Sequence, residues 1–157
     1  MVHLVLASSV LIAMVGHKRS KYTYIVSCLL LFAFAALRYM YGNDYGNYYA
    51  NYFRIHAGVK DVYDEWLFTL LNQISPSFFS LIAVSSAVFV YCIYRLIVDN
   101  LSADFAWIGL LIFVVNPYLF LMNLSALRQC IAMVAFIAAV HFAIRYLHRW
   151  HSVPYCS

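Results

Sequence analysis

The chain has 157 residues, of which 66% are hydrophobic and only 10% are charged, and its formal net charge at pH 7 is +4. Soluble domains have about a quarter of their residues charged, so this chain has too few charged groups to cover a soluble globule. The composition therefore predicts a protein of the lipid bilayer. The positive charge is spread over loops and the ends of apolar stretches, so it gives no indication of nucleic-acid binding.

Five apolar stretches approach the length of a membrane span, and they lie at residues 2–16, 22–37, 78–98, 105–122 and 129–147. At about 1.5 Å per residue, the last three reach about 27–32 Å, which matches a hydrocarbon core of about 30 Å. The first two need snorkelling flanks or local thinning of the bilayer. The stretches lack the alternation of barrel strands, so we predict an all-α polytopic bundle of five spans, forming a single membrane domain over the whole chain.

The first stretch does not have the charge order of a signal peptide. A signal peptide carries its positive charge before the apolar core, whereas here Lys18, Arg19 and Lys21 follow the core. We therefore expect residues 2–16 to remain as a transmembrane helix. Because short loops rich in Lys and Arg stay in the cytoplasm, alternation of the spans places residues 38–77 and the start of the last span outside.

The sequence contains no metal, nucleotide or redox motif. Its four cysteines lie at positions 28, 92, 130 and 156 without a CxxC pair, and its six histidines are scattered. Cysteines inside apolar spans behave as small hydrophobic residues. We therefore expect no cofactor and no metal site.

The outer segment of residues 38–77 is long for a loop, and loops of this length are usually functional or disordered. Its many aromatic side chains argue against disorder. Helical spacing predicts a short helix over about residues 62–74 that lies at the outer membrane interface or re-enters the bundle. Acids lie in its first turns, where they favour the helix dipole. The spacing is that of Tyr63, Leu67, Leu70, Leu71 and Ile74, and the acids are Asp61, Asp64 and Glu65.

Six tyrosines lie between Arg38 and Phe53. An aromatic belt at the membrane interface explains part of this number. It does not explain the turn-forming residues Gly42-Asn43-Asp44 and Gly46-Asn47, nor the charges of Arg38 and Asp44 so close to lipid. The alternative is a site for a carbohydrate or a lipid headgroup, because sugars present hydroxyls together with apolar ring faces.

A second polar cluster opens the last span on the same predicted side of the membrane. It contains Arg128, with Gln129 beside it. Arginine can bind a phosphate with two donors, a geometry that lysine cannot supply. At the other end of this span, Arg145 is expected only to snorkel to the interface.

Three blocks of the sequence resemble the EpsG family of Wzy-like polymerases of exopolysaccharide and O-antigen. In the family's order, they are Arg38-x-x-x-Gly42-x-Asp44-Tyr45-x-x-Tyr48, Asp64-Glu65 leading into residues 67–71, and Asn123…Arg128-Gln129-x-x-Ala132. The resemblance implies a multi-pass enzyme of the bacterial inner membrane, a glycosyltransferase-type polymerase. Such an enzyme joins oligosaccharide repeat units carried on undecaprenyl pyrophosphate.

The resemblance also implies roles for particular residues. The substrate-binding candidates are Arg38, Tyr45, Tyr48, Arg128 and Gln129, and the candidate catalytic bases are Asp44 and Glu65. The two arginines would neutralise the leaving diphosphate, and the two tyrosines would line the sugar site. The choice between the two acids stays open.

The implied partners are a lipid-linked oligosaccharide, membrane lipid, and a chain-length regulator or other polysaccharide assembly proteins, with no nucleic acid. Members of the family are markedly longer, with about twice as many spans, so the chain resembles an amino-terminal portion and its own activity is open. One alternative is a non-catalytic membrane remnant or subunit. Another is a small transporter component, which needs ionisable groups near mid-bilayer; among the predicted spans, only His141 approaches such a position.

Overall fold

The computed structural model describes residues 2–16, 21–59, 62, 65–102, 104–116, 119–120 and 125–151. Within these residues the chain forms seven helices and no strand, which confirms the predicted all-α class for this part of the chain. The helices are α1 (Val2–Gly16), α2 (Lys21–Ala36), α3 (Tyr45–His56), α4 (Trp66–Ile74), α5 (Phe78–Asn100), α6 (Ala106–Val115) and α8 (Leu127–His151).

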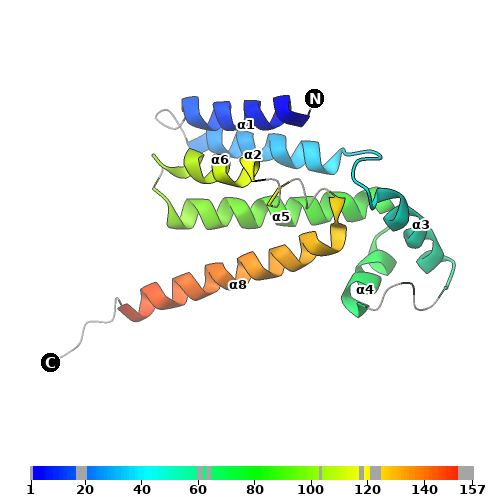
Figure 1. The fold of residues 1–157 in the computed structure, drawn as a ribbon. Helices are drawn as coiled ribbons and strands as arrows, with labels where there is room; N and C mark the ends of the chain where they lie inside the picture. The colour runs from blue at the N-terminus through cyan, green and yellow to red at the C-terminus, as the bar shows by residue number, and fades with distance from the viewer. Residues whose placement is uncertain are drawn as a thin grey trace.

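The longer helices lie side by side and form the body of the molecule, while α3 and α4 lie together at one end (Figure 1). In the body, α1 packs on α2 and α6, and α5 packs on α2, α6 and α8. The interior is apolar, and Leu31, Leu110 and Phe120 are among its most buried side chains. Since lipid tails are as apolar as these side chains, close packing rather than the hydrophobic effect holds such helices together.

Small residues allow α1 and α2 to approach each other. Ser9 and Ser27 are fully buried, and Ala13 and Ala35 are nearly so. Each serine hydroxyl donates a hydrogen bond to a carbonyl of its own helix, Ser9 to Leu6 and Ser27 to Thr23. Both hydroxyls are therefore satisfied in an apolar interior, as buried polar groups need to be.

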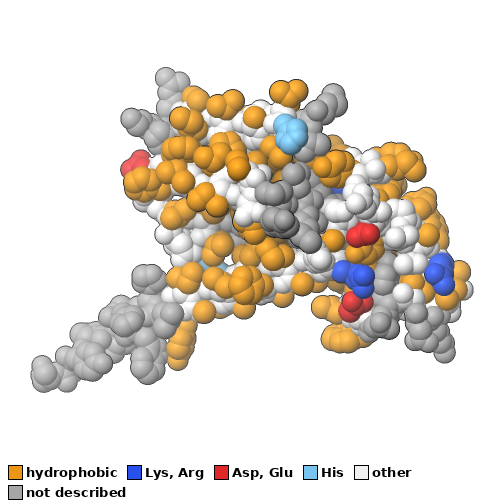
Figure 2. Space-filling model, viewed as in Figure 1, with side chains coloured by type: hydrophobic (Ala, Val, Ile, Leu, Met, Phe, Trp, Pro, Cys, Tyr) orange, Lys and Arg blue, Asp and Glu red, His pale blue; other side chains and the backbone are white. Residues whose placement is uncertain are grey.

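The outer faces of the helices are apolar as well. Large apolar side chains such as Leu4, Val15, Val84 and Phe142 are more than 60% exposed, and Figure 2 shows hydrophobic side chains spread across the visible face of the body. Helices that are hydrophobic on all sides are typical of a lipid environment.

All five predicted apolar stretches contain helices, but five spans are not confirmed. Among the described residues, α5 and the Leu127–Tyr146 part of α8 are long and apolar enough to cross a membrane. The other apolar helices are shorter, at His3–Val15, Tyr22–Ala36 and Ala106–Val115. The predicted orientation depends on a loop at residues 17–21, of which residues 17–20 lie outside the described residues and Lys21 begins α2.

The fourth predicted span, residues 105–122, is interrupted. Helix α6 ends at Val115, and its C-cap Asn116 has an extended backbone with φ −76° and ψ 111°. Asn116 precedes Pro117, and a residue before proline is disfavoured in the helical region. The helix therefore ends before the proline; the kink predicted at Pro117 itself lies outside the described residues.

The outer segment contains one helix more than predicted. Gly46 and Asn47, predicted to form a turn, lie inside α3, so this turn prediction is wrong. The turn at Gly42 is present, with φ 99°, a conformation that glycine adopts without strain. The predicted interfacial helix forms but begins at Trp66, with Glu65 as its N-cap and no acid in its first turn, and Asp61, Tyr63 and Asp64 lie outside the described residues.

Candidate functional site

The predicted site residues lie at the end of the molecule where α3, α4 and the starts of α5 and α8 meet (Figure 1). A second hydrophobic cluster, separate from the core of the body, joins these elements. Its buried members are Tyr45, Tyr48, Tyr52, Phe68, Phe78, Leu81, Ile82 and Leu127. Figure 2 shows acidic and basic side chains gathered at this end, beside the largely apolar body. The end is thus built from an aromatic interior with a charged surface.

Helix α3 supplies a buried face of tyrosines. Tyr45, Tyr48, Tyr52 and Ile55 are buried, and they recur at the spacing of one helical face. The ring of Tyr48 packs edge-on against Phe68 of α4, with 5.8 Å between centroids. The tyrosines between positions 38 and 53 therefore divide into a buried set on α3 and an exposed set, Tyr39, Tyr41 and Tyr49.

Arg128 at the start of α8 forms an ion pair with Glu65 at the start of α4. Its Nη1 lies 2.9 Å from Oε1 and 3.2 Å from Oε2 of the carboxylate. The Tyr48 hydroxyl is a further hydrogen-bonding partner of Arg128. Both charged side chains are about half exposed, at 47% for Arg128 and 54% for Glu65, so the guanidinium is open to a ligand from solution.

Arg38 is the buried arginine of the site. It follows α2 directly and is only 8% exposed. Burial lowers the pKa of Arg38, while the neighbouring Cys130, Tyr45 and Tyr48 raise it. Since arginine stays charged in proteins, this end of the molecule holds a fixed positive charge beneath its surface.

Tyr48 is the common neighbour of the two arginines. It interacts electrostatically with Arg38 and hydrogen-bonds to Arg128. The two arginines come from the end of α2 and the start of α8, which are 90 positions apart in the sequence. The fold therefore brings together Arg38, Tyr45, Tyr48, Glu65 and Arg128.

The two other predicted residues lie at the margin of this group. Asp44 is the N-cap of α3, where its side chain makes no capping hydrogen bond, and it is half-buried. Gln129 follows Arg128 on α8 and has an exposed side chain. Asp44 is thus placed beside Tyr45 by chain position, and Gln129 at the same end of α8, but neither is part of the Arg128–Glu65 pair.

Two residues that stabilise the helices around the site were not predicted from the sequence. The Tyr52 hydroxyl donates a 2.7 Å hydrogen bond to the carbonyl of Ser75, which ties α3 to the end of α4. Asn72 is 1% exposed, and its amide donates to the Phe68 carbonyl at 2.7 Å. The signal for Tyr52 was its helical spacing from Tyr45 and Tyr48. The signal for Asn72 was its position four residues after Phe68, on the same face of the helix.

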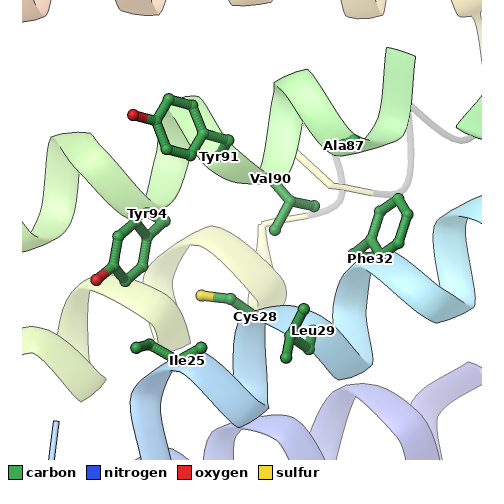
Figure 3. Close-up of a pocket in the computed structure, with 8 residues that line it drawn as sticks. All are labelled: Ile25, Cys28, Leu29, Phe32, Ala87, Val90, Tyr91 and Tyr94. Atoms are coloured by element: carbon green, nitrogen blue, oxygen red, sulfur yellow. The ribbon is translucent and has the colours of Figure 1, made fainter. Parts of the chain in front are cut away.

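A cavity of about 380 Å³ lies elsewhere, between α2 and α5 in the body (Figure 3). Side chains of both helices line it, among them Cys28 and Phe32 from α2 and Val90 and Tyr94 from α5. It contains none of the predicted site residues and is almost wholly apolar. The candidate site is therefore the charged end of the molecule and not this cavity.

Residues 21–152 match the model of the EpsG family, and this range includes all three sequence blocks. The chain belongs to the EpsG family. No curated protein and no solved structure matches it. Family membership and the apolar helices together indicate a membrane protein with a polysaccharide-polymerase-like function. In this EpsG-family chain, the charged end contains Arg38, Glu65 and Arg128, which lie in the blocks that resemble the family.

Proposed function

We propose that this chain is a membrane polysaccharide polymerase, or a portion of one, that joins oligosaccharide repeat units carried on undecaprenyl pyrophosphate. Its place is the bacterial inner membrane, which it crosses several times, and its products are exopolysaccharide or O-antigen. A chain-length regulator or another assembly protein is the proposed partner. The support comes from membership of the EpsG family and from the chemistry gathered at the charged end.

The observation that carries the proposal is the convergence of Arg38, Tyr48 and Arg128. A lipid diphosphate carries several negative charges, and a polymerase must neutralise them as the diphosphate leaves. Arg128 is half exposed and able to meet the diphosphate directly. Arg38 is buried and acts on it through its charge, while Tyr48 lies between the two and donates or accepts hydrogen bonds with the substrate.

The proposed step transfers a glycosyl group. A hydroxyl of the acceptor sugar attacks the anomeric carbon of the donor, and the bond between that carbon and the diphosphate oxygen breaks. The diphosphate leaves with the electron pair of the broken bond, and a carboxylate takes the proton of the attacking hydroxyl. No further reactant is needed, because the diphosphate is itself the leaving group.

The geometry favours Asp44 over Glu65 as the base. The Glu65 carboxylate is already bound to Arg128 through both oxygens. The Asp44 carboxylate does not cap α3 and is half-buried at the start of the helix, beside Tyr45. We assign Glu65 the role of a counter-ion that holds Arg128 until the diphosphate takes its place.

The test is to express Arg38→Ala and Arg128→Ala in a strain without its own polymerase. We expect both variants to lose long-chain polysaccharide while the amount of protein in the membrane stays the same. Arg54→Ala is the matched control, because Arg54 is an exposed arginine on α3 that hydrogen-bonds to Asn51 at 3.4 Å. The Arg54→Ala variant removes the same charge from the same end of the molecule and should leave the length of the polysaccharide unchanged.

Polysaccharide of unaltered length in both Arg38→Ala and Arg128→Ala would exclude a role of these arginines in neutralising the diphosphate. Failure of the unaltered protein to restore long polysaccharide in the same strain would instead favour a non-catalytic subunit or remnant.

A further inference from the structure

The opposite ends of α5 and α8 carry a second group of charged side chains, the Asp99 cluster. Its members are Arg95 and Asp99 of α5 and His141 and Arg145 of α8. The Oδ2 atom of Asp99 lies 2.8 Å from a guanidinium nitrogen of Arg95, 3.2 Å from one of Arg145 and 3.2 Å from Nε2 of His141. The expectation that Arg145 only snorkels is therefore wrong, because it pairs with an acid on another helix.

The Asp99 cluster has more positive than negative charge. One carboxylate is shared by two arginines, which leaves an excess of one positive charge without counting His141. The Asp99 contact involves one nitrogen of each guanidinium, whereas a guanidinium has five N–H donors. Arg95 and Arg145 are 38% and 57% exposed, so both can offer donors to an anion that approaches from outside.

The cluster forms one wall of a cavity of about 290 Å³ between α5 and α8. Arg95, His141 and Arg145 line its charged part, and Tyr91, Ile137 and Phe142 line its apolar part. Both helices run from the candidate site toward the Asp99 cluster (Figure 1). Tyr91 and Ile137 therefore lie about one helical turn nearer the middle of the molecule than Arg95 and His141.

The cavity thus has a positively charged end next to an apolar groove that leads toward the middle of two membrane-length helices. Tyr91 and Phe142 are 60% and 70% exposed, so the groove opens outward. The Nδ1 atom of His141 is buried and has no hydrogen-bond partner among the described residues. A soluble anion would use only the charged end, whereas a phospholipid would use both parts.

We propose that this groove binds a phosphate-bearing lipid, with the phosphate between Arg95 and Arg145 and the hydrocarbon chain along Tyr91, Ile137 and Phe142. Arginine is suited to the phosphate because its planar fork donates two parallel hydrogen bonds. Asp99 competes with the phosphate for the same arginines and holds them together while the groove is empty. The proposal does not depend on the polymerase activity, because it uses no residue of the candidate site.

The test measures lipid binding to the detergent-purified protein by native mass spectrometry. Phosphatidylglycerol is compared with diacylglycerol of the same acyl chains and with inorganic phosphate. We expect phosphatidylglycerol to bind and the other two to bind at least about tenfold more weakly, since a hydrogen bond to a charged group contributes about 1.5–3 kcal/mol. Binding of diacylglycerol as tight as that of phosphatidylglycerol, or displacement of the lipid by an equal concentration of inorganic phosphate, would overturn the proposal.

Variants locate the site. Arg95→Gln and Arg145→Gln should each weaken phosphatidylglycerol binding by about tenfold, whereas Arg54→Gln, at the other end of the molecule, should not. Asp99→Asn removes the competing carboxylate and should tighten binding. If the arginine variants unfold in detergent, the Asp99→Asn result still decides, because unchanged or weaker binding by a folded Asp99→Asn protein contradicts the proposed competition.

Discussion

Glu65 binds Arg128 through both of its carboxylate oxygens, at 2.9 and 3.2 Å, although the two residues are 63 positions apart in the sequence. Both side chains are about half exposed, and exposed ion pairs contribute only about 0–1 kcal/mol to stability. The pair therefore does little to hold the fold together. Its effect is to fix where the Arg128 guanidinium lies, next to the hydroxyl of Tyr48.

The two acids of the site can be separated by variants that keep their shape. We expect Asp44→Asn to lower the polymerisation rate by about 10²–10⁴-fold, the usual contribution of a general base. Glu65→Gln should lower it by less than about tenfold, because it removes only an exposed ion pair. The rate is measured as polysaccharide formed per unit of membrane protein, and a larger loss for Glu65→Gln than for Asp44→Asn would reverse the assignment.

Two tyrosines on the same face of α3 should respond differently to loss of their hydroxyls. Tyr48→Phe removes a hydrogen-bonding partner of Arg128 but keeps the ring against Phe68, so we expect activity to fall by about tenfold with little change in stability. Tyr52→Phe removes the bond to the Ser75 carbonyl and should lower the free energy of unfolding by about 0.5–1.5 kcal/mol. Activity per folded molecule should then stay unchanged.

Thermal unfolding in detergent and polysaccharide synthesis are measured on both variants. Full activity of Tyr48→Phe would mean that Tyr48 acts through packing alone, and an equal loss of activity per folded molecule in the two variants would contradict a distinct role for its hydroxyl.

Because of Tyr45, the free energy of unfolding should decrease at alkaline pH. Burial raises the pKa of Tyr45, Tyr39 and Tyr49 add to the increase, and Arg38 opposes it. The folded state therefore keeps this proton when the unfolded chain, with a phenol pKa of about 10, has lost it. The contribution of Tyr45 is complete below pH of about 10 and is lost as the pH rises through the folded-state pKa.

We therefore expect the unfolding temperature to fall above pH of about 10, and to fall less steeply in Tyr45→Phe. Tyr41→Phe, which changes an exposed tyrosine, is the matched control. Identical slopes for Tyr45→Phe and the unaltered protein would contradict the prediction.

Two glycines differ in what surrounds them. A Cβ at Gly46 in α3 would meet nothing within 4 Å, so Gly46→Ala should stabilise the helix by up to about 1 kcal/mol. A Cβ at Gly109 in α6 would lie 2.8 Å from Leu101 Cδ1 and 3.3 Å from two atoms of Ile97. Gly109→Val should therefore destabilise the contact between α5 and α6 by about 1–3 kcal/mol. Thermal unfolding should show a higher unfolding temperature for Gly46→Ala and a lower one for Gly109→Val. Stabilisation by Gly109→Val would show that the contact between α5 and α6 can accommodate a larger side chain.

The apolar helices could be predicted from the sequence because their boundaries follow the polar residues that flank them. The predicted stretches at residues 2–16, 22–37 and 78–98 begin and end within about two residues of α1, α2 and α5. The fourth stretch was predicted too long because hydropathy continues through Asn116 and Pro117, whereas the backbone before a proline leaves the helical region. Hydropathy alone does not predict that a helix ends before a proline.

Helix α3 was missed for a different reason. Gly46, Asn47 and Asn51 have low helix propensity, and Gly46-Asn47 was interpreted as a turn. Packing of Tyr45 and Tyr52 against the start of α5 outweighs that propensity. The residues of the candidate site could be predicted from the three sequence blocks that resemble the family. The pairing of Glu65 with Arg128 could not be predicted, because it depends on the path of the chain between α3 and α4.

Helix α8 runs without a break from Leu127 to His151. One of its arginines, Arg128, is held by Glu65 near its start, and another, Arg145, is held by Asp99 near its other end. An unbroken helix transmits a displacement along its axis as a rigid rod. A displacement of α8 along its axis would therefore strain both ion pairs together, although they lie at opposite ends of the helix.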